Sequence, residues 1–319
     1  MSDQVRLKPD TTTGHEVRLK PDPTSWRGVR IQPDFVSWRG VRLHPDFVSW
    51  RGVRLQPDFV RPIVIALTLL FALVPVLQPR VDAQLPTAPD DRYAGLQWRF
   101  VRIKYHYVTE GTRIQDEFNG EPWLIDGPAA EQNLSRRIKT ATAIDVQDPT
   151  VLTLDDPRLF TYPWIYFVEP GNLKLTDTDA KTLREFLLRG GTATFDDFHG
   201  PFEWEHFAGE MKKVFPDREI VEIPKDHPVF SCFYKIDGYP QVAGLGSFMA
   251  GRSWEKGGYV AHLRTIFDDT NRPMLFINWN TDMGDGWEWS NVEEYPGYMK
   301  YTAMAYRMGI NEVVYALTH

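Results

Sequence analysis

The chain has 319 residues, of which 42% are apolar and 13% aromatic, so it can build a packed core and is not disordered throughout. Residues 1–83 hold 12 Lys/Arg and 8 Asp/Glu, which leaves 24 basic and 35 acidic residues in the remainder, a net charge of −11. This acidic body argues against nucleic acid as a partner. Cys232 is the only cysteine, which excludes an internal disulfide bond and a multi-cysteine zinc site.

Residues 1–59 consist mainly of a short repeat. The motifs VRLKPD, VRIQPD, VRLHPD and VRLQPD recur with a period of 12 residues. Each unit carries a proline and charged residues with few apolar side chains to bury, so we expect a disordered, low-complexity segment. The segment is either a repetitive binding arm or a translated DNA repeat upstream of the true start codon. The second interpretation is favoured, because a unit this short matches no packed repeat architecture.

Residues 60–83 have the layout of a signal peptide. Arg61 precedes an apolar run at residues 62–77, and the small residue Ala83 precedes a predicted cleavage site. The run is short for a membrane span, and an uncleaved N-terminal anchor is the alternative. Both interpretations predict a periplasmic or secreted body, attached to the membrane only if residues 62–77 are retained. Residues 84–92, rich in proline and aspartate, are expected to form a linker.

Residues 93–319 are predicted to form a single α/β domain. Residues 98–107, WRFVRIKYHY, alternate between apolar and polar side chains as a strand does. Asp126 is predicted to cap the helix that follows, with Pro128 in its first turn. The apolar face of this helix should contain Leu134, Ile138 and Ala141.

Residues 157–206 predict a strand, a helix and a second strand. Continuous apolar runs at residues 163–168 and 192–195 are typical of strands that are covered on both faces. Between them, Thr176 stands three residues before Asp179, a spacing that caps a helix. A crossover of this kind gives a mainly parallel sheet flanked by helices, whose ligands bind beyond the carboxyl ends of the strands.

The rest of the body continues the alternation of helices and strands. A helix is predicted from the apolar positions Trp204, Phe207, Met211 and Val214. Further strands are expected at residues 219–223, 257–267 and 272–280, followed by a last helix at 296–308 and an apolar segment at 310–318 that docks on the sheet.

Several motifs in this order resemble a known bacterial family. They are YPWIYFVEPG, LLRGGTATFDDFHG, FPDREIVEIPKDHPVF, NTDMGDGWEW and GINEVVYALT. The body is similar to the family catalogued as domain of unknown function 4159, which itself resembles the class I glutamine amidotransferase-like superfamily. The resemblance implies a flavodoxin-like sheet with helices on both faces, and a nucleophile on the tight turn after a central strand.

The sequence departs from the amidotransferase pattern at that turn. Residues 196–200 read DDFHG, with neither cysteine nor serine. An amidotransferase needs a thiolate there to form its thioester. Cys232 lies in an apolar segment and is interpreted as a structural thiol. Glutamine amidotransferase activity is therefore not expected.

Two loops at predicted strand ends gather polar and acidic side chains. The first contains Asp196, Asp197 and His199, and the second contains Asn280, Asp282, Asp285 and Glu288. If the loops meet, they form an oxygen-rich site that suits calcium, magnesium or manganese. Its metal ligands would be Asp197, His199, Asp282 and Asp285. The alternative is that these acids serve as turn and capping residues.

Two further residues are candidates at the same edge. His227 precedes a proline, which favours an extended backbone that could present the ring to the site. Trp287 is a ligand-binding candidate, because aromatic faces beside carboxylates suit sugars and cations. The alternatives are a hydrogen-bonded loop histidine and a tryptophan-rich lid over the end of the sheet.

These patterns lead to two expected functions. The first is a non-catalytic module that binds a ligand, such as a glycan, or assembles with a cell-envelope protein. The second is an extracytoplasmic hydrolase that uses a divalent metal to activate water against a glycan or an ester. Its catalytic candidates are Asp196, Asp197, His199 and His227. Carboxylates of both loops that converge on one point would favour the hydrolase, whereas carboxylates that spread apart and bond backbone amides would favour the binding module.

Overall fold

The computed structural model describes residues 91–111, 121–291, 293 and 295–319. The predicted repeats, signal peptide and most of the linker lie outside the described residues. The described part belongs to one compact unit, Asp82–His319. Among the described residues, no helix has both the length and the apolar character needed to cross a membrane.

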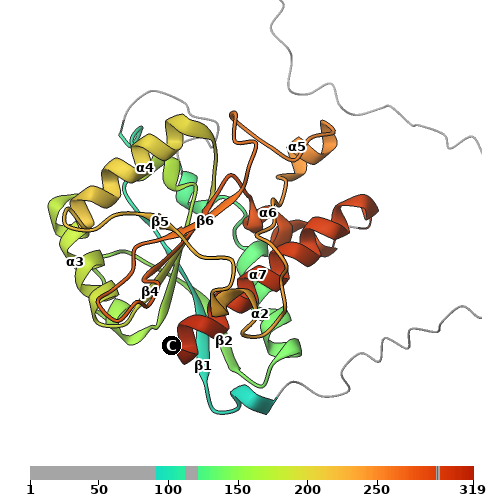
Figure 1. Cartoon of the computed structure of the whole chain (residues 1–319), viewed down its shortest axis with the longest axis horizontal. Coiled ribbons are helices and arrows are strands. Elements are labelled where there is room, and N and C mark those ends of the chain that lie inside the picture. Colours follow the sequence, from blue (N-terminus) through green and yellow to red (C-terminus); the bar gives the residue numbers. More distant parts are fainter. Residues whose placement is uncertain (1–90, 112–120, 292, 294) are drawn as a thin grey trace, which may run out of the picture. The chain divides into compact units, whose positions relative to one another are not determined.

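A mixed, mostly parallel sheet of seven strands forms the centre of this unit (Figure 1). The strands are β1 Gln97–Ile103, β2 Asp145–Leu152, β3 Trp164–Val168, β4 Thr192–Phe198, β5 Val221–Glu222, β6 His262–Thr265 and β7 Leu275–Trp279. Their order is β2-β1-β3-β4-β7-β6-β5. The first five are parallel, whereas β6 runs antiparallel to both β7 and β5. The predicted α/β class with a mainly parallel sheet is confirmed.

The predicted strand-helix-strand unit is present as β3, α3 and β4. Phe167 on β3 is the register partner of Phe195 on β4 in a parallel pair. Helix α3 begins with a capping box, in which the Thr176 hydroxyl accepts the Asp179 N–H and the Asp179 carboxylate accepts the Thr176 N–H. These two bonds satisfy amides that the first helical turn leaves without partners, so the sequence sets the start of this helix locally.

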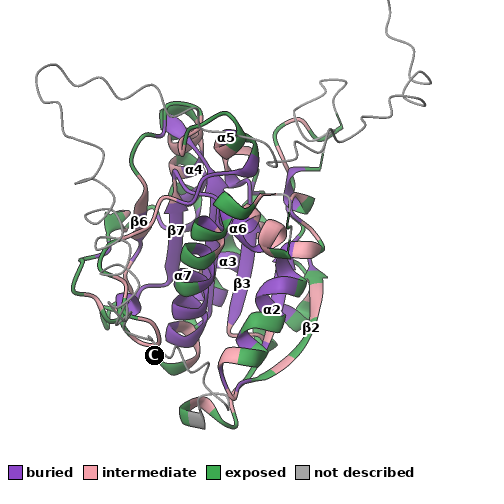
Figure 2. Cartoon of the chain, turned by 90° about the vertical axis from the view of Figure 1, so that its right-hand side faces the viewer, coloured by how far each residue is buried: buried purple, intermediate pink, exposed green. Residues whose placement is uncertain are grey.

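Helices cover both faces of the sheet (Figure 2). The longer ones are α2 Ala129–Ala141, α3 Asp177–Leu188, α4 Gly200–Val214 and α7 Met299–Thr318, and the short ones are α5 Leu245–Met249 and α6 Met283–Glu288. Short 3-10 helices occupy Asp91–Tyr93, Pro122–Leu124, Pro157–Thr161, Pro170–Asn172, Pro228–Phe230, Trp289–Asn291 and Pro296–Tyr298. Strand β3 faces both layers, because Tyr166 belongs to the core cluster under α2, α6 and α7 and Phe167 to the cluster under α3 and α4.

Several elements differ from the sequence prediction. Strand β2 was not predicted, because its polar residues and Pro149 are tolerated only at the exposed edge that it occupies. Strands β5 and β6 are shorter than expected. The last helix and the apolar segment 310–318 are one continuous helix, α7. Gly309 does not end it, since an added Cβ there would lie 2.7 Å from the Trp287 ring, which shows that this glycine permits close packing.

A buried polar network crosses the core beneath α7. Thr194 on β4 accepts a hydrogen bond from the Trp164 indole and donates one to the Glu312 carboxylate, each at 2.9 Å. Glu312 is 1% exposed. Burial raises the pKa of Glu312 to about 8.

Replacing Glu312 by glutamine is expected to weaken the pH dependence of stability. The pKa of this carboxyl is raised from 4.5 to about 8 in the folded protein, so stability is lost as the pH rises through that window, because the unfolded chain releases its proton first. A shift of this size corresponds to about 4 to 5 kcal/mol at most. Urea denaturation of both proteins from about pH 5 to about pH 8 measures the difference. Equal slopes for the two proteins would contradict the prediction.

Candidate functional site

An acidic pocket of about 330 Å³ opens at the carboxyl edge of the parallel strands. Its walls come from the loops after β1 and β3, the end of β4, the start of α6, and the segment around residues 244–256. Six carboxylates line it, from Asp126, Glu169, Asp197, Glu255, Asp282 and Asp285. Of the described residues, two with cationic side chains, Arg252 and Lys256, line it with them, so this wall carries a net charge of −4 when it is ionised. We call this site the acidic pocket.

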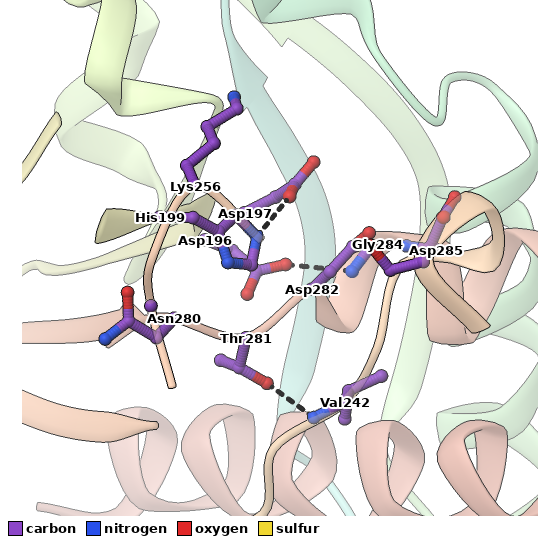
Figure 3. Close-up of polar contacts among 12 residues, drawn as sticks. Asp196, Asp197, His199, Val242, Lys256, Asn280, Thr281, Asp282, Gly284 and Asp285 are labelled. Atoms are coloured by element: carbon purple, nitrogen blue, oxygen red, sulfur yellow. Dashed lines mark hydrogen bonds and ion pairs between the residues drawn. The ribbon is translucent and has the colours of Figure 1, made fainter. Parts of the chain in front are cut away.

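Strand β4 contributes Asp196 and Asp197, which point in different directions (Figure 3). Asp196 is fully buried, and its Oδ2 accepts hydrogen bonds from the Tyr166 hydroxyl at 2.9 Å and the Gly284 N–H at 2.8 Å. Burial and the neighbouring Asp197 charge raise the pKa of Asp196 to about 7. Asp196 therefore fastens α6 to β4 from beneath, rather than lining the pocket.

Asp197 lines the pocket and is backed by His199. Its backbone has a φ of 60°, in the left-handed region that few residues other than glycine adopt. Such conformations are over-represented at functional sites. The His199 Nε2 lies 3.1 Å from the Asp197 Oδ1 (Figure 3). Burial raises the pKa of Asp197, whereas the hydrogen bond to His199 opposes that shift. His199 is 2% exposed and lies behind Asp197, where it can orient this carboxylate but does not reach the pocket.

Helix α6 supplies two more carboxylates. The Asp282 Oδ1 caps the helix by accepting the Asp285 N–H at 2.7 Å. Asp285 accepts the Leu245 N–H at 2.6 Å through Oδ2. Burial and the charges of Asp197 and Asp285 raise the pKa of Asp282 well above its usual range. These acids therefore serve as capping residues and also line the pocket, so the two interpretations of the sequence are compatible.

Glu288, one turn further along α6, lies beside Asp285 and half-buried. Burial and the Asp285 charge raise its pKa to about 7. Burial and a neighbouring negative charge destabilise the ionised form of Glu288, so a nearby cation would stabilise that form.

Asp126 also lines the pocket, although its sequence context predicts a helix cap. It was predicted to cap α2, but that helix begins at Ala129 without a side-chain cap. Asp126 is 9% exposed, has a φ of 62°, and its Oδ2 has no hydrogen-bond partner among the described residues. Burial and the charges of Asp285 and Asp197 raise its pKa well above the usual range. The one sequence feature that could have predicted Asp126 as a pocket residue is its position in the loop after the first parallel strand.

Arg102 on β1 supports the Asp126 loop from inside the protein. Its guanidinium forms two hydrogen bonds to the Glu131 carboxylate, at 3.1 and 2.6 Å. It also donates to the carbonyl oxygens of Trp123 and Ile125, at 3.1 and 2.9 Å. Ile125 directly precedes Asp126 and Trp123 lies three residues before it, so this arginine fixes the loop that carries the carboxylate.

The carboxylates converge closely enough to share a cation. One oxygen from each of Asp126, Asp197 and Asp282 lies within 4.8 Å of the others, and the same holds for Asp126, Asp285 and Glu288. Oxygen ligands on opposite sides of a calcium ion are about 4.6 to 5.2 Å apart, so these spacings fit one coordination sphere. Hard oxygen donors suit calcium, magnesium or manganese.

Of the predicted site residues, six do not line the pocket: Asp196, His199 and Glu288, described above, and Asn280, Trp287 and His227. Asn280 accepts the Gly200 N–H and donates to the Val260 carbonyl, so it joins β7 to the start of α4. Trp287 is fully buried in the core against Phe100 and Tyr166, where no ligand reaches it.

His227 lies at the other end of β7. Its Nδ1 accepts the Val229 N–H, which caps a short 3-10 helix, and its ring packs on Tyr315 near the end of α7. The ring also lies near Phe267, which pairs with Pro273 just before β7 begins, whereas the acidic pocket lies beyond the end of that strand. The prediction that His227 reaches the acidic pocket was therefore wrong.

The fold and the pocket define an α/β domain with clustered carboxylates at the carboxyl edge of a mainly parallel sheet. The chain belongs to the family described as domain of unknown function (DUF4159), whose sequence model matches residues 99–317. The family predicted from the motifs is thus confirmed. No curated protein matches the chain significantly.

Proposed function

We propose that this protein is an exported α/β domain that binds a divalent cation in the acidic pocket and holds a ligand through it. The observation that carries the proposal is the convergence of Asp126, Asp197 and Asp282, whose carboxylate oxygens lie within 4.8 Å of one another. Three ionised carboxylates at this spacing repel one another strongly in a buried setting, and a divalent cation relieves that repulsion. The bound ligand, such as a glycan or a cell-envelope protein, would complete the coordination sphere.

A thermal-shift experiment tests the cation site. After treatment with a chelator, calcium or manganese is expected to raise the melting temperature, because a ligand present at about 100 times its Kd adds about 2.7 kcal/mol of stability. Asp282→Asn should abolish this shift while the fold persists, since asparagine caps a helix as well as aspartate does. Asp237→Asn is the matched control, because the Asp237 side chain is 92% exposed and outside the pocket. A wild-type protein that responds to neither ion would refute the proposal.

A second candidate function is a metal-assisted hydrolase. It is favoured by the open volume of about 330 Å³ beside the carboxylates, which can admit a substrate group next to a bound cation. His199 would then be a positioning residue, since it holds Asp197 from behind. Manganese-loaded protein is tested on chromogenic esters and glycosides. Turnover by the wild type that is lost in Asp197→Asn would support the hydrolase. Cation binding without turnover would support the binding module instead.

We also propose that the domain is related to the class I glutamine amidotransferase-like superfamily. The five parallel strands support this, because in chain order they are arranged 2-1-3-4-5, the order of flavodoxin-like sheets. At the end of β4, where the nucleophile would stand, this chain has Asp197. Burial raises the pKa of the Cys232 thiol to about 11, so it is a poor replacement nucleophile.

A further inference from the structure

Asp126 belongs to two sets of converging carboxylates, one within the acidic pocket and one that extends from the pocket wall to Glu288. One set joins it to Asp197 and Asp282, and the other joins it to Asp285 and Glu288. A carboxylate has two oxygens and about four lone-pair sites, so it can coordinate one cation on each side. Asp126 is thus the one residue that the two sets share.

Asp126 is prepared for this role by its surroundings. It is 9% exposed, and its Oδ2 has no hydrogen-bond partner among the described residues. This oxygen also lies against the first turn of α6, since an added Cβ at Gly284 would be 2.0 Å from it. The carboxylate is therefore directed at the helix that carries the other acids. A buried carboxylate oxygen without a donor is costly when ionised, and a cation in front of it would relieve that cost.

The charge of the five carboxylates, when they are ionised, favours two cations over one. When ionised, Asp126, Asp197, Asp282, Asp285 and Glu288 carry five negative charges. One divalent cation leaves three of these charges uncompensated, whereas two cations leave one. The absence of a side chain at Gly244 leaves room for these acids, since an added Cβ there would lie 2.6 Å from a Glu255 oxygen and 2.8 Å from an Asp282 oxygen.

We infer that the acidic pocket holds a pair of divalent cations bridged by the Asp126 carboxylate. Asp197 and Asp282 ligate one ion, and Asp285 and Glu288 ligate the other. This inference rests on the proposed cation site and adds its stoichiometry and its bridging ligand. Pairs of ions about 3.5 to 4 Å apart clamp an oxygen-rich group between them, so the ligand class is one with an oxyanion, such as a phosphate ester or a carboxylate.

The test counts manganese ions bound to the full chain, by equilibrium dialysis and native mass spectrometry. Wild-type protein is expected to bind two ions per chain, with the spin-coupled electron paramagnetic resonance spectrum of a bridged pair. Glu288→Gln and Asp197→Asn should each leave one ion and an uncoupled spectrum. Asp126→Asn should weaken both ions by more than about tenfold, whereas Asp237→Asn should change neither. Melting curves without metal show whether each variant is folded.

The outcomes separate this inference from the function on which it rests. One ion per chain at saturation, lost in Asp197→Asn and retained in Glu288→Gln, would overturn the pair and leave a single cation site. Two bound ions with an uncoupled wild-type spectrum would contradict the proposal that Asp126 bridges them. Absence of any bound manganese or calcium would remove both the pair and the proposed function.

Discussion

Replacing Arg102 by methionine is expected to lower the free energy of unfolding by about 3 to 5 kcal/mol, the usual cost of removing one partner from a buried ion pair. The side chains of Arg102 and Glu131 are 1% and 8% exposed, so the variant leaves a buried carboxylate without its cation. Two loop carbonyls also lose their donor. Urea denaturation measures the loss, and cation titration should show weaker binding, because the same arginine fixes the Asp126 loop.

The double variant Arg102→Met with Glu131→Leu separates the two causes. It removes the stranded carboxylate as well, so most of the stability should return. Cation binding should remain weak, since the carbonyls of Trp123 and Ile125 still lack their donor. A single variant as stable as the wild type would show that the ion pair contributes nothing to the fold.

Gly200→Ala is expected to destabilise the protein by about 2 to 4 kcal/mol, because it combines backbone strain with a steric clash. Gly200 has a φ of +72°, and an added Cβ would lie 1.9 Å from the Lys256 carbonyl oxygen. The methyl group must therefore push away the segment that carries Glu255 and Lys256, one wall of the acidic pocket. Thermal denaturation measures the first effect, and cation titration measures the second.

Gly209→Ala is the matched control on the same helix. Gly209 lies inside α4, and an added Cβ there meets nothing within 4 Å. Alanine should stabilise this position by about 0.5 to 1 kcal/mol, because it is the better helix former. If Gly200→Ala were as harmless as this control, the close approach of the 255–258 segment to α4 would be wrong.

Those parts of the fold that local patterns determine could be predicted from the sequence. The strand-helix-strand unit from β3 to β4 follows from two buried apolar runs and a capping box, all within about 40 residues. The edge strand β2 could not, because an exposed strand carries no continuous apolar run. The continuity of α7 could not be predicted either. Gly309 suggests a helix end in the sequence, and only its contact with the Trp287 ring shows that it lies within the helix.

The acidic pocket could be predicted only in part. Asp197, Asp282 and Asp285 were named because acids after parallel strands gather at one edge of a sheet. Asp126 resembled a helix cap, and only the three-dimensional structure shows that its carboxylate faces α6 instead. His227 was misplaced for a related reason, since the identity of a residue before proline does not say at which end of the sheet it lies.

The pocket draws its carboxylates from segments that leave the ribosome at very different times. Asp126 precedes β2, whereas Asp285 and Glu288 stand on α6, one helix before the end of the chain. During synthesis the earlier acids are exposed long before their partners exist, and domains fold as units once their elements are available. The cation binding proposed above would therefore follow synthesis of α6, and a truncated product that lacks α6 and α7 would lack Asp285 and Glu288.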